Sequence, residues 1–92
     1  MQIVWTSRAV ADLTEIRQYI ADDSPSAANR VAQKILSSAE RLSRHPHLGH
    51  PGREPGMREL GVPGLPDILC YTVHRWRLAI LAVLHTSRER LD

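Results

Sequence analysis

The chain has 92 residues, enough for one small domain with a modest hydrophobic core. Its composition is 42% hydrophobic and 24% charged, which excludes an intrinsically disordered protein. The longest uninterrupted apolar run, Leu78 to Leu84, is far shorter than the roughly 20 residues of a membrane-spanning helix. No secretory signal pattern opens the chain, and its single cysteine, Cys70, cannot form an internal disulfide. We therefore expect one cytoplasmic domain over residues 1–92 with no membrane contact.

The basic residues are almost all arginine, and they are evenly spread along the chain. Twelve positive groups, of which Lys34 is the only lysine, face ten carboxylates. Residues 1–46 carry six positive and five negative charges, and residues 47–92 carry the same numbers. A protein that binds nucleic acid through a basic arm or patch usually shows more asymmetry. The sequence thus predicts no basic arm, although arginine suits bidentate contacts to carboxylates or phosphates.

The first half of the chain predicts a strand and a helical hairpin. Residues 2–5 alternate weakly, as in a short strand. Apolar residues then recur at intervals of three and four over 8–22, which is typical of one face of a helix. Ser24 and Pro25 fit the N-cap and the first residue of a second helix, 25–44.

The second half predicts a loop followed by three strands. Residues 45–56 contain three prolines and three glycines and are therefore expected to form a loop. Strands are predicted at 57–62, 67–74 and 77–85, with a tight turn at Arg75-Trp76 between the last two. Because the connections are short, these strands should pair antiparallel.

The last two predicted strands have apolar residues on both faces. Residues 68–71 and 78–84 are apolar without interruption, a pattern typical of strands covered on both sides. Two helices joined by a tight turn can cover only one face. Either a partner chain or the loop 45–56 must cover the other, and we expect a partner, because a large bare apolar face marks an interaction site.

Four stretches of the sequence carry a family resemblance. They are Trp5 with Ala11-Asp12-Leu13 and Tyr19-Ile20-Ala21, then Pro25 with Ala27-Ala28 and Ile35, then Leu42, Pro46 and Gly49 with Pro51-Gly52-Arg53 and Met57-Arg58-Glu59-Leu60-Gly61-Val62, and finally Ile68 to Val73 with Ile80 to Arg88. In this order they resemble the RelE/ParE toxin superfamily of bacterial toxin–antitoxin modules, and ParE more closely than RelE. The resemblance implies an α+β fold of order β-α-α-β-β-β, with the helical hairpin on one face of a largely antiparallel sheet.

The resemblance also implies a partner. Toxins of this superfamily are neutralised by a protein antitoxin, which wraps the toxin with an otherwise disordered segment. Such a segment would supply the missing cover of the sheet, although Tyr71 and Trp5 also fit core positions. The predicted antitoxin-facing residues are Leu69, Tyr71, Leu81 and Val83.

Two activities occur on this fold, and the fold alone does not choose between them. RelE-type toxins are ribosome-dependent ribonucleases that cut mRNA. That chemistry needs an acid–base group and cations near the phosphate. The candidates here are His85, Arg88 and Arg58. Arg58 fits an anchor or a partner contact better than a catalyst, and His85 also fits a residue that caps its strand with a hydrogen bond. Three features oppose a ribonuclease: Ile68 stands where RelE-like enzymes place an arginine, lysine is nearly absent, and no aromatic residue follows Trp76.

ParE-type toxins instead poison DNA gyrase, which requires binding and no catalytic group. An aromatic residue between two cations at a hairpin tip is typical of a binding surface, unless Trp76 folds back onto the sheet edge. The predicted contacts with the target or partner are Arg75, Trp76, Arg77, Arg88 and Arg90. Inhibition of gyrase is the leading hypothesis, followed by the ribonuclease and by an inactive relative that only binds antitoxin.

A histidine cluster in the loop raises the question of a metal site. His45, His47 and His50 lie within six residues, a spacing that could suit zinc. They flank Pro46 and Gly49, however, and no cysteine or aspartate lies nearby. A solvated loop is the better interpretation, and we expect neither metal nor cofactor.

Overall fold

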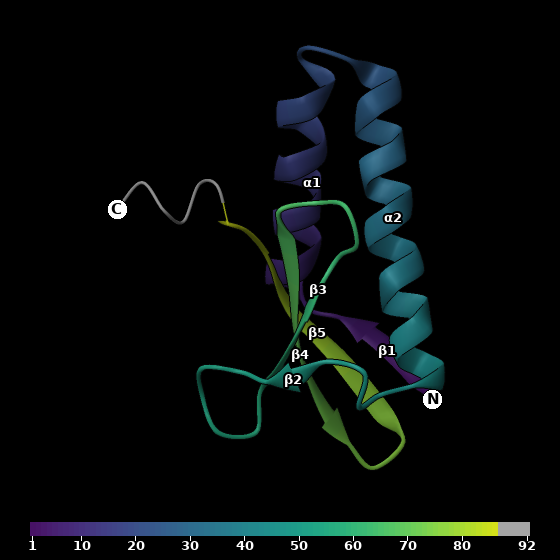
Figure 1. Ribbon diagram of the computed structural model, residues 1–92, viewed down its shortest axis with the longest axis vertical. Helices are drawn as coiled ribbons and strands as arrows, with labels where there is room; N and C mark the ends of the chain where they lie inside the picture. Colours follow the sequence, from purple (N-terminus) through teal and green to yellow (C-terminus); the bar gives the residue numbers. More distant parts are fainter. Residues whose placement is uncertain (87–92) are drawn as a thin grey trace.

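The computed structural model describes residues 1–86 as a helical hairpin on a five-stranded sheet (Figure 1). The elements are β1 (Gln2–Trp5), α1 (Ser7–Ala21), α2 (Pro25–Arg44), β2 (His50–Pro51), β3 (Arg58–Gly61), β4 (Asp67–His74) and β5 (Arg77–His85). The strand order is β1-β5-β4-β3-β2, in which β1 runs parallel to β5 and the other pairs are antiparallel. This arrangement confirms the predicted α+β class. Only β2, two residues inside a proline-rich loop, was not predicted.

The two helices begin at capped residues, as their sequences indicate. The Thr6 hydroxyl accepts a hydrogen bond from the amide of Ala9, and the Ser24 hydroxyl accepts one from Ala27, both at 3.2 Å. Each such cap stabilises a helix by about 1 kcal/mol. No helix within residues 1–86 combines the length and the apolar character needed to cross a membrane.

The core lies between the helical hairpin and one face of the sheet. A β-bulge in β5 shapes that face, because the pairing with β4 passes from Ile80 directly to Ala82. Leu81 is the extra residue. Ile80 and Val83 therefore both face the helices, whereas strict alternation would place them on opposite faces. The fully buried side chains of this core include Ile35, Leu42, Leu69, Tyr71, Leu78 and Ile80.

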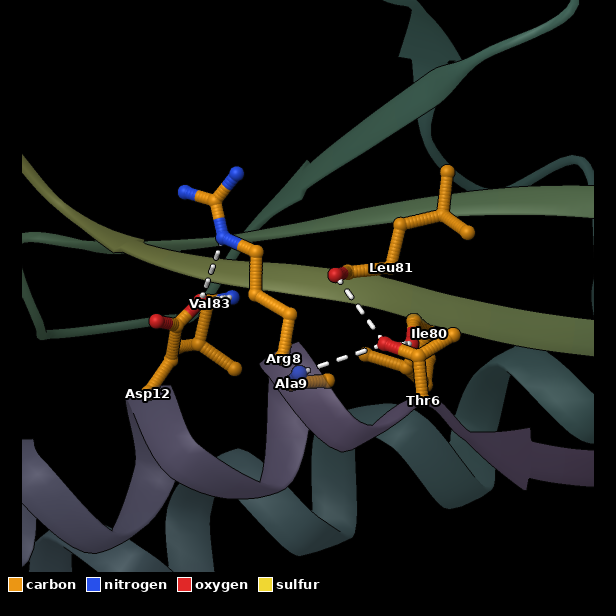
Figure 2. Close-up of polar contacts among 7 residues, drawn as sticks. All are labelled: Thr6, Arg8, Ala9, Asp12, Ile80, Leu81 and Val83. Carbon is orange, nitrogen blue, oxygen red and sulfur yellow. Dashed lines mark hydrogen bonds and ion pairs between the residues drawn. The ribbon is translucent and has the colours of Figure 1, made fainter.

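The N-cap residue and the first two turns of α1 take the place of a strand along the second half of β5 (Figure 2). β1 pairs only with the first half of β5 and ends at Trp5. Beyond that point the Asp12 carboxylate accepts a hydrogen bond from the amide of Val83 at 3.0 Å. The Thr6 hydroxyl lies 2.9 Å from the Ile80 carbonyl and 3.1 Å from that of Leu81. Side chains of α1 thus satisfy backbone groups that a longer β1 would otherwise have paired.

Candidate functional site

Three of the four predicted antitoxin-facing residues lie in the core, on the face of the sheet that the helices cover. Leu69 and Tyr71 are 0% exposed and Val83 is 3% exposed, and all three belong to the core under the helices. Leu81 is half-buried in the bulge. The apolar runs show that both faces are apolar, but they do not reveal which alternate set of residues the helical hairpin covers. This part of the sequence prediction is corrected.

The opposite face of the sheet carries smaller apolar side chains together with the Glu59 carboxylate, which pairs across the strands with Cys70 and lies 3.4 Å from the Arg53 guanidinium. The strand register places on it Val4, Ile68, Cys70, Thr72, Ala79, Ala82 and Leu84. Burial, with the Glu59 carboxylate adding to it, raises the pKa of the Cys70 thiol above its ordinary value. Because the thiol therefore stays protonated near neutral pH, it is a packing group and not a nucleophile.

Residues 46–49 are fastened to the helix side of the sheet and do not cover this second face. The Tyr71 hydroxyl donates to the Pro46 carbonyl at 2.9 Å and accepts from the Gly49 amide at 3.0 Å. The Arg58 guanidinium donates to the carbonyls of His47, at 3.2 Å, and of Gly49. Arg58, a candidate catalytic cation in the sequence, is thus an anchor for the loop.

A hydrogen bond between a histidine and a buried carboxylate closes the far end of the β4–β5 hairpin. The His85 Nδ1 atom lies 2.6 Å from the Asp67 carboxylate, whose side chain is 1% exposed, while that of His85 is 19% exposed. With the Nδ1 proton donated to Asp67, Nε2 is the imidazole atom left for other partners. The sequence analysis missed Asp67, because an unbulged hairpin would pair it with Leu84. The bulge brings His85 opposite instead.

The two ribonuclease candidates within residues 1–86, Arg58 and His85, lie apart in the structure. Arg58 pairs with Tyr71, whereas His85 pairs with Asp67, four residues away along β4 and thus about 13 Å at the rise of a strand. Arg88 and Arg90 lie outside the described residues. No group of three or more histidine, cysteine, aspartate or glutamate side chains within residues 1–86 is placed to hold a metal ion.

The turn between β4 and β5, defined here as the hairpin tip (residues 74–77), presents an exposed aromatic side chain between two cations. Trp76 is 66% exposed, so it does not fold back onto the sheet edge. Its carbonyl accepts a hydrogen bond from the amide of Gln2 at 3.0 Å, which holds the turn against β1. Arg75 has a φ of +57°, in the left-handed region that costs an ordinary residue about 1 kcal/mol. Neither Arg75 nor Arg77 has an ion pair or a side-chain hydrogen bond within the part of the chain that the structure describes.

A groove lies between the two helices. The groove is lined by side chains from Leu13 to Ala21 of α1 and from Pro25 to Leu36 of α2. Arg17 of α1 donates a 2.7 Å hydrogen bond to Asn29 of α2, which ties its two walls together.

Comparisons with known proteins agree on one group. Residues 3–90 match the family model described as the ParE toxin of the type II toxin–antitoxin system parDE. Putative toxin Y4kP of Sinorhizobium fredii is 39% identical over 88 residues, covering 96% of this chain and 91% of that protein. Toxin RelE2 of Caulobacter vibrioides is 39% identical over 87 residues, covering 95% and 97% respectively. A solved structure of the chromosomal ParDE TA system from P. aeruginosa has a TM-score of 0.82 at 27% identity, covering 92% of this chain and 95% of that one.

Proposed function

The chain belongs to the ParE toxin family of type II toxin–antitoxin systems, and from this premise we propose that it arrests growth by inhibiting DNA gyrase. As a toxin of such a system, it has a protein antitoxin as its partner. Inhibition by binding requires a surface that recognises the target, and no catalytic group. The toxin holds gyrase in the state in which its DNA is cut, and the antitoxin prevents this encounter.

The hairpin tip is the observation that carries the proposal. Trp76 is the most exposed large apolar side chain within residues 1–86, and Arg75 and Arg77 flank it. Tryptophan and arginine are the residues most enriched among binding hot spots. The separation of Arg58 from His85 supports a binding mechanism over cleavage, since the two candidate groups cannot act on one phosphate.

A ribosome-dependent ribonuclease is the second candidate, and one observation favours it. An imidazole held by a buried carboxylate, as His85 is held by Asp67, is an arrangement that general bases use. This candidate requires that His85 reach a 2′-hydroxyl, and that cations come from outside the described residues.

Supercoiling by purified gyrase tests the two candidates. We expect the full-length chain to reduce supercoiling and to accumulate cut plasmid, and the cognate antitoxin to reverse both effects. A Trp76→Ala variant should need about 30-fold more protein, the scale of one hot-spot residue. Val10→Ala, which trims another exposed apolar side chain on α1, is the matched control and should change nothing. Unaffected gyrase, together with transcript cuts in cells that disappear in His85→Ala, would overturn the proposal in favour of the ribonuclease.

A further inference from the structure

We propose that the hairpin tip is a binding site for single-stranded DNA, in which the Trp76 indole stacks on an unpaired base while Arg75 and Arg77 contact phosphates. This inference rests on the proposed function, because an enzyme caught with its DNA cut exposes strand ends. It goes further by assigning the tip to the cut DNA within the gyrase–DNA complex that the toxin recognises.

The exposure of Trp76 is the first argument. At 66% exposed, the indole has a free aromatic face, and the backbone beneath it is fixed by the hydrogen bond from Gln2 to the Trp76 carbonyl. Every base has an aromatic face, so a fixed and exposed indole is a platform for any unpaired base. The platform needs no sequence-specific contact, which suits a toxin that must act wherever its target has cut.

The backbone of Arg75 is the second argument. The other positive φ values within residues 1–86 belong to glycines, Gly56 and Gly64. A two-residue hairpin turn normally takes glycine or asparagine at such a position. Arginine brings strain that the turn itself does not require, and strain of this kind concentrates at functional sites. An arginine kept at this strained position therefore supports a role for its charge in binding.

The local charge and shape are the third argument. His74, Arg75 and Arg77 surround Trp76, and neither arginine has an acidic partner within residues 1–86. Guanidinium groups bind phosphate in a bidentate manner. The tip is also narrow, and it lies at the opposite end of the long axis from the α1–α2 turn (Figure 1). A stable protein interface buries about 800 Å² on each partner, which is more than four residues supply, whereas a stacked base with two phosphates fits.

Fluorescence of Trp76 gives a direct test. In a Trp5→Phe background Trp76 is the only tryptophan of the full-length chain. A 12-nucleotide single-stranded DNA should quench its emission at low salt, with saturation. Anisotropy of the same oligonucleotide, labelled with a dye, measures affinity without the Trp5 substitution. In that assay Trp76→Ala should weaken binding by about 10- to 100-fold, the range for loss of one stacked base.

Substitutions of arginine distinguish DNA binding at the tip from nonspecific attraction of DNA to the positive charge of the protein. Arg75→Gly relieves the backbone strain, so weaker binding cannot come from misfolding. It should bind severalfold more weakly and lower the slope of log affinity against log salt by about 0.7, the value for one phosphate contact on a single strand. Arg30→Gln, on the exposed surface of α2, is the control and should leave affinity unchanged.

Several results would overturn the inference. They are the absence of quenching, equal affinity in Trp76→Ala, equal losses in Arg30→Gln and Arg75→Gly, and equal quenching by polyglutamate, which would indicate an acidic protein partner. RNA of the same length binding more than tenfold tighter would reject DNA as the ligand. If Trp76→Ala loses DNA binding but still inhibits gyrase fully, DNA binding by the tip has no role in inhibition, and the proposed target still stands. If the chain binds DNA but does not inhibit gyrase, the proposed target is refuted, whereas the DNA site at the tip still stands.

Discussion

Removing the Tyr71 hydroxyl should detach the loop at residues 46–49 from the sheet. In Tyr71→Phe the ring stays in the core, and only the oxygen is lost. That oxygen is the partner of both the Pro46 carbonyl, at 2.9 Å, and the Gly49 amide, at 3.0 Å. Gly49 is buried, so its amide would be left without a partner and away from water.

The expected loss in the free energy of unfolding follows from these two hydrogen bonds. A typical intramolecular hydrogen bond contributes about 1 kcal/mol net, and an unsatisfied buried group costs about 1–3 kcal/mol. We expect Tyr71→Phe to lower the free energy of unfolding by about 2–3 kcal/mol, or the midpoint of thermal unfolding by about 10–15 °C for a domain of this size. Urea denaturation followed by circular dichroism measures the change, and hydrogen exchange should show faster exchange of the Gly49 amide.

A second substitution at the same anchor sharpens the test. Arg58→Met removes the guanidinium that donates to the carbonyls of His47 and Gly49. Because both side chains hold one loop, the double variant should lose at least about 0.5 kcal/mol less than the sum of the single losses. A loss below about 0.5 kcal/mol in Tyr71→Phe, or strict additivity with Arg58→Met, would refute the view that these groups act together on the loop.

Three further changes test other contacts. Asp67→Asn removes the buried carboxylate that accepts the hydrogen bond from His85, and we expect a loss of about 1–3 kcal/mol in urea denaturation; a change below about 0.5 kcal/mol would mean that this bond is not formed. Asp12→Ala leaves the Val83 amide unpaired and should cost about 1–2 kcal/mol, whereas Asp22→Ala, at the exposed end of α1, is the control. The pKa of Cys70 is raised by burial above its ordinary value of 9.0, so the unfolded chain loses this proton first and stability should fall above about pH 9. That loss should be absent in Cys70→Ala, and a thiol reagent should modify the folded protein slowly at pH 7.

The bounds of the elements were predictable because their signals are local. Ser24 and Pro25 mark the start of α2 by themselves, and the structure places it there. Residues 67–74 and 77–85, read from the positions of the turns, are the observed limits of β4 and β5. Hydroxyl caps and tight turns act within a few residues, so sequence alone determines them.

The faces of the sheet were not predictable, because they depend on the bulge. An uninterrupted apolar run hides the extra residue, Leu81, since no polar residue interrupts the pattern on either side of it. The shift moves Val83 into the core and brings His85 opposite Asp67. For the same reason the sequence did not indicate the contact between His85 and Asp67. Leu69 and Tyr71 were assigned to the free face because an apolar run does not reveal which alternate set of residues the helices cover. Exposure of Trp76 also depends on tertiary structure, because both a folded-back and a free indole fit the same sequence.

The way α1 covers β5 has a consequence for the toxin once its antitoxin is gone. Unpaired strand edges are templates on which identical chains add to one another and aggregate. Here the outer strands of the sheet are β1, of four residues, and β2, of two, one of which is Pro51 and lacks an amide hydrogen. The longest exposed stretch that β5 would offer is occupied by Asp12 and Thr6. The freed toxin therefore offers little strand edge on which a second copy could add by backbone pairing.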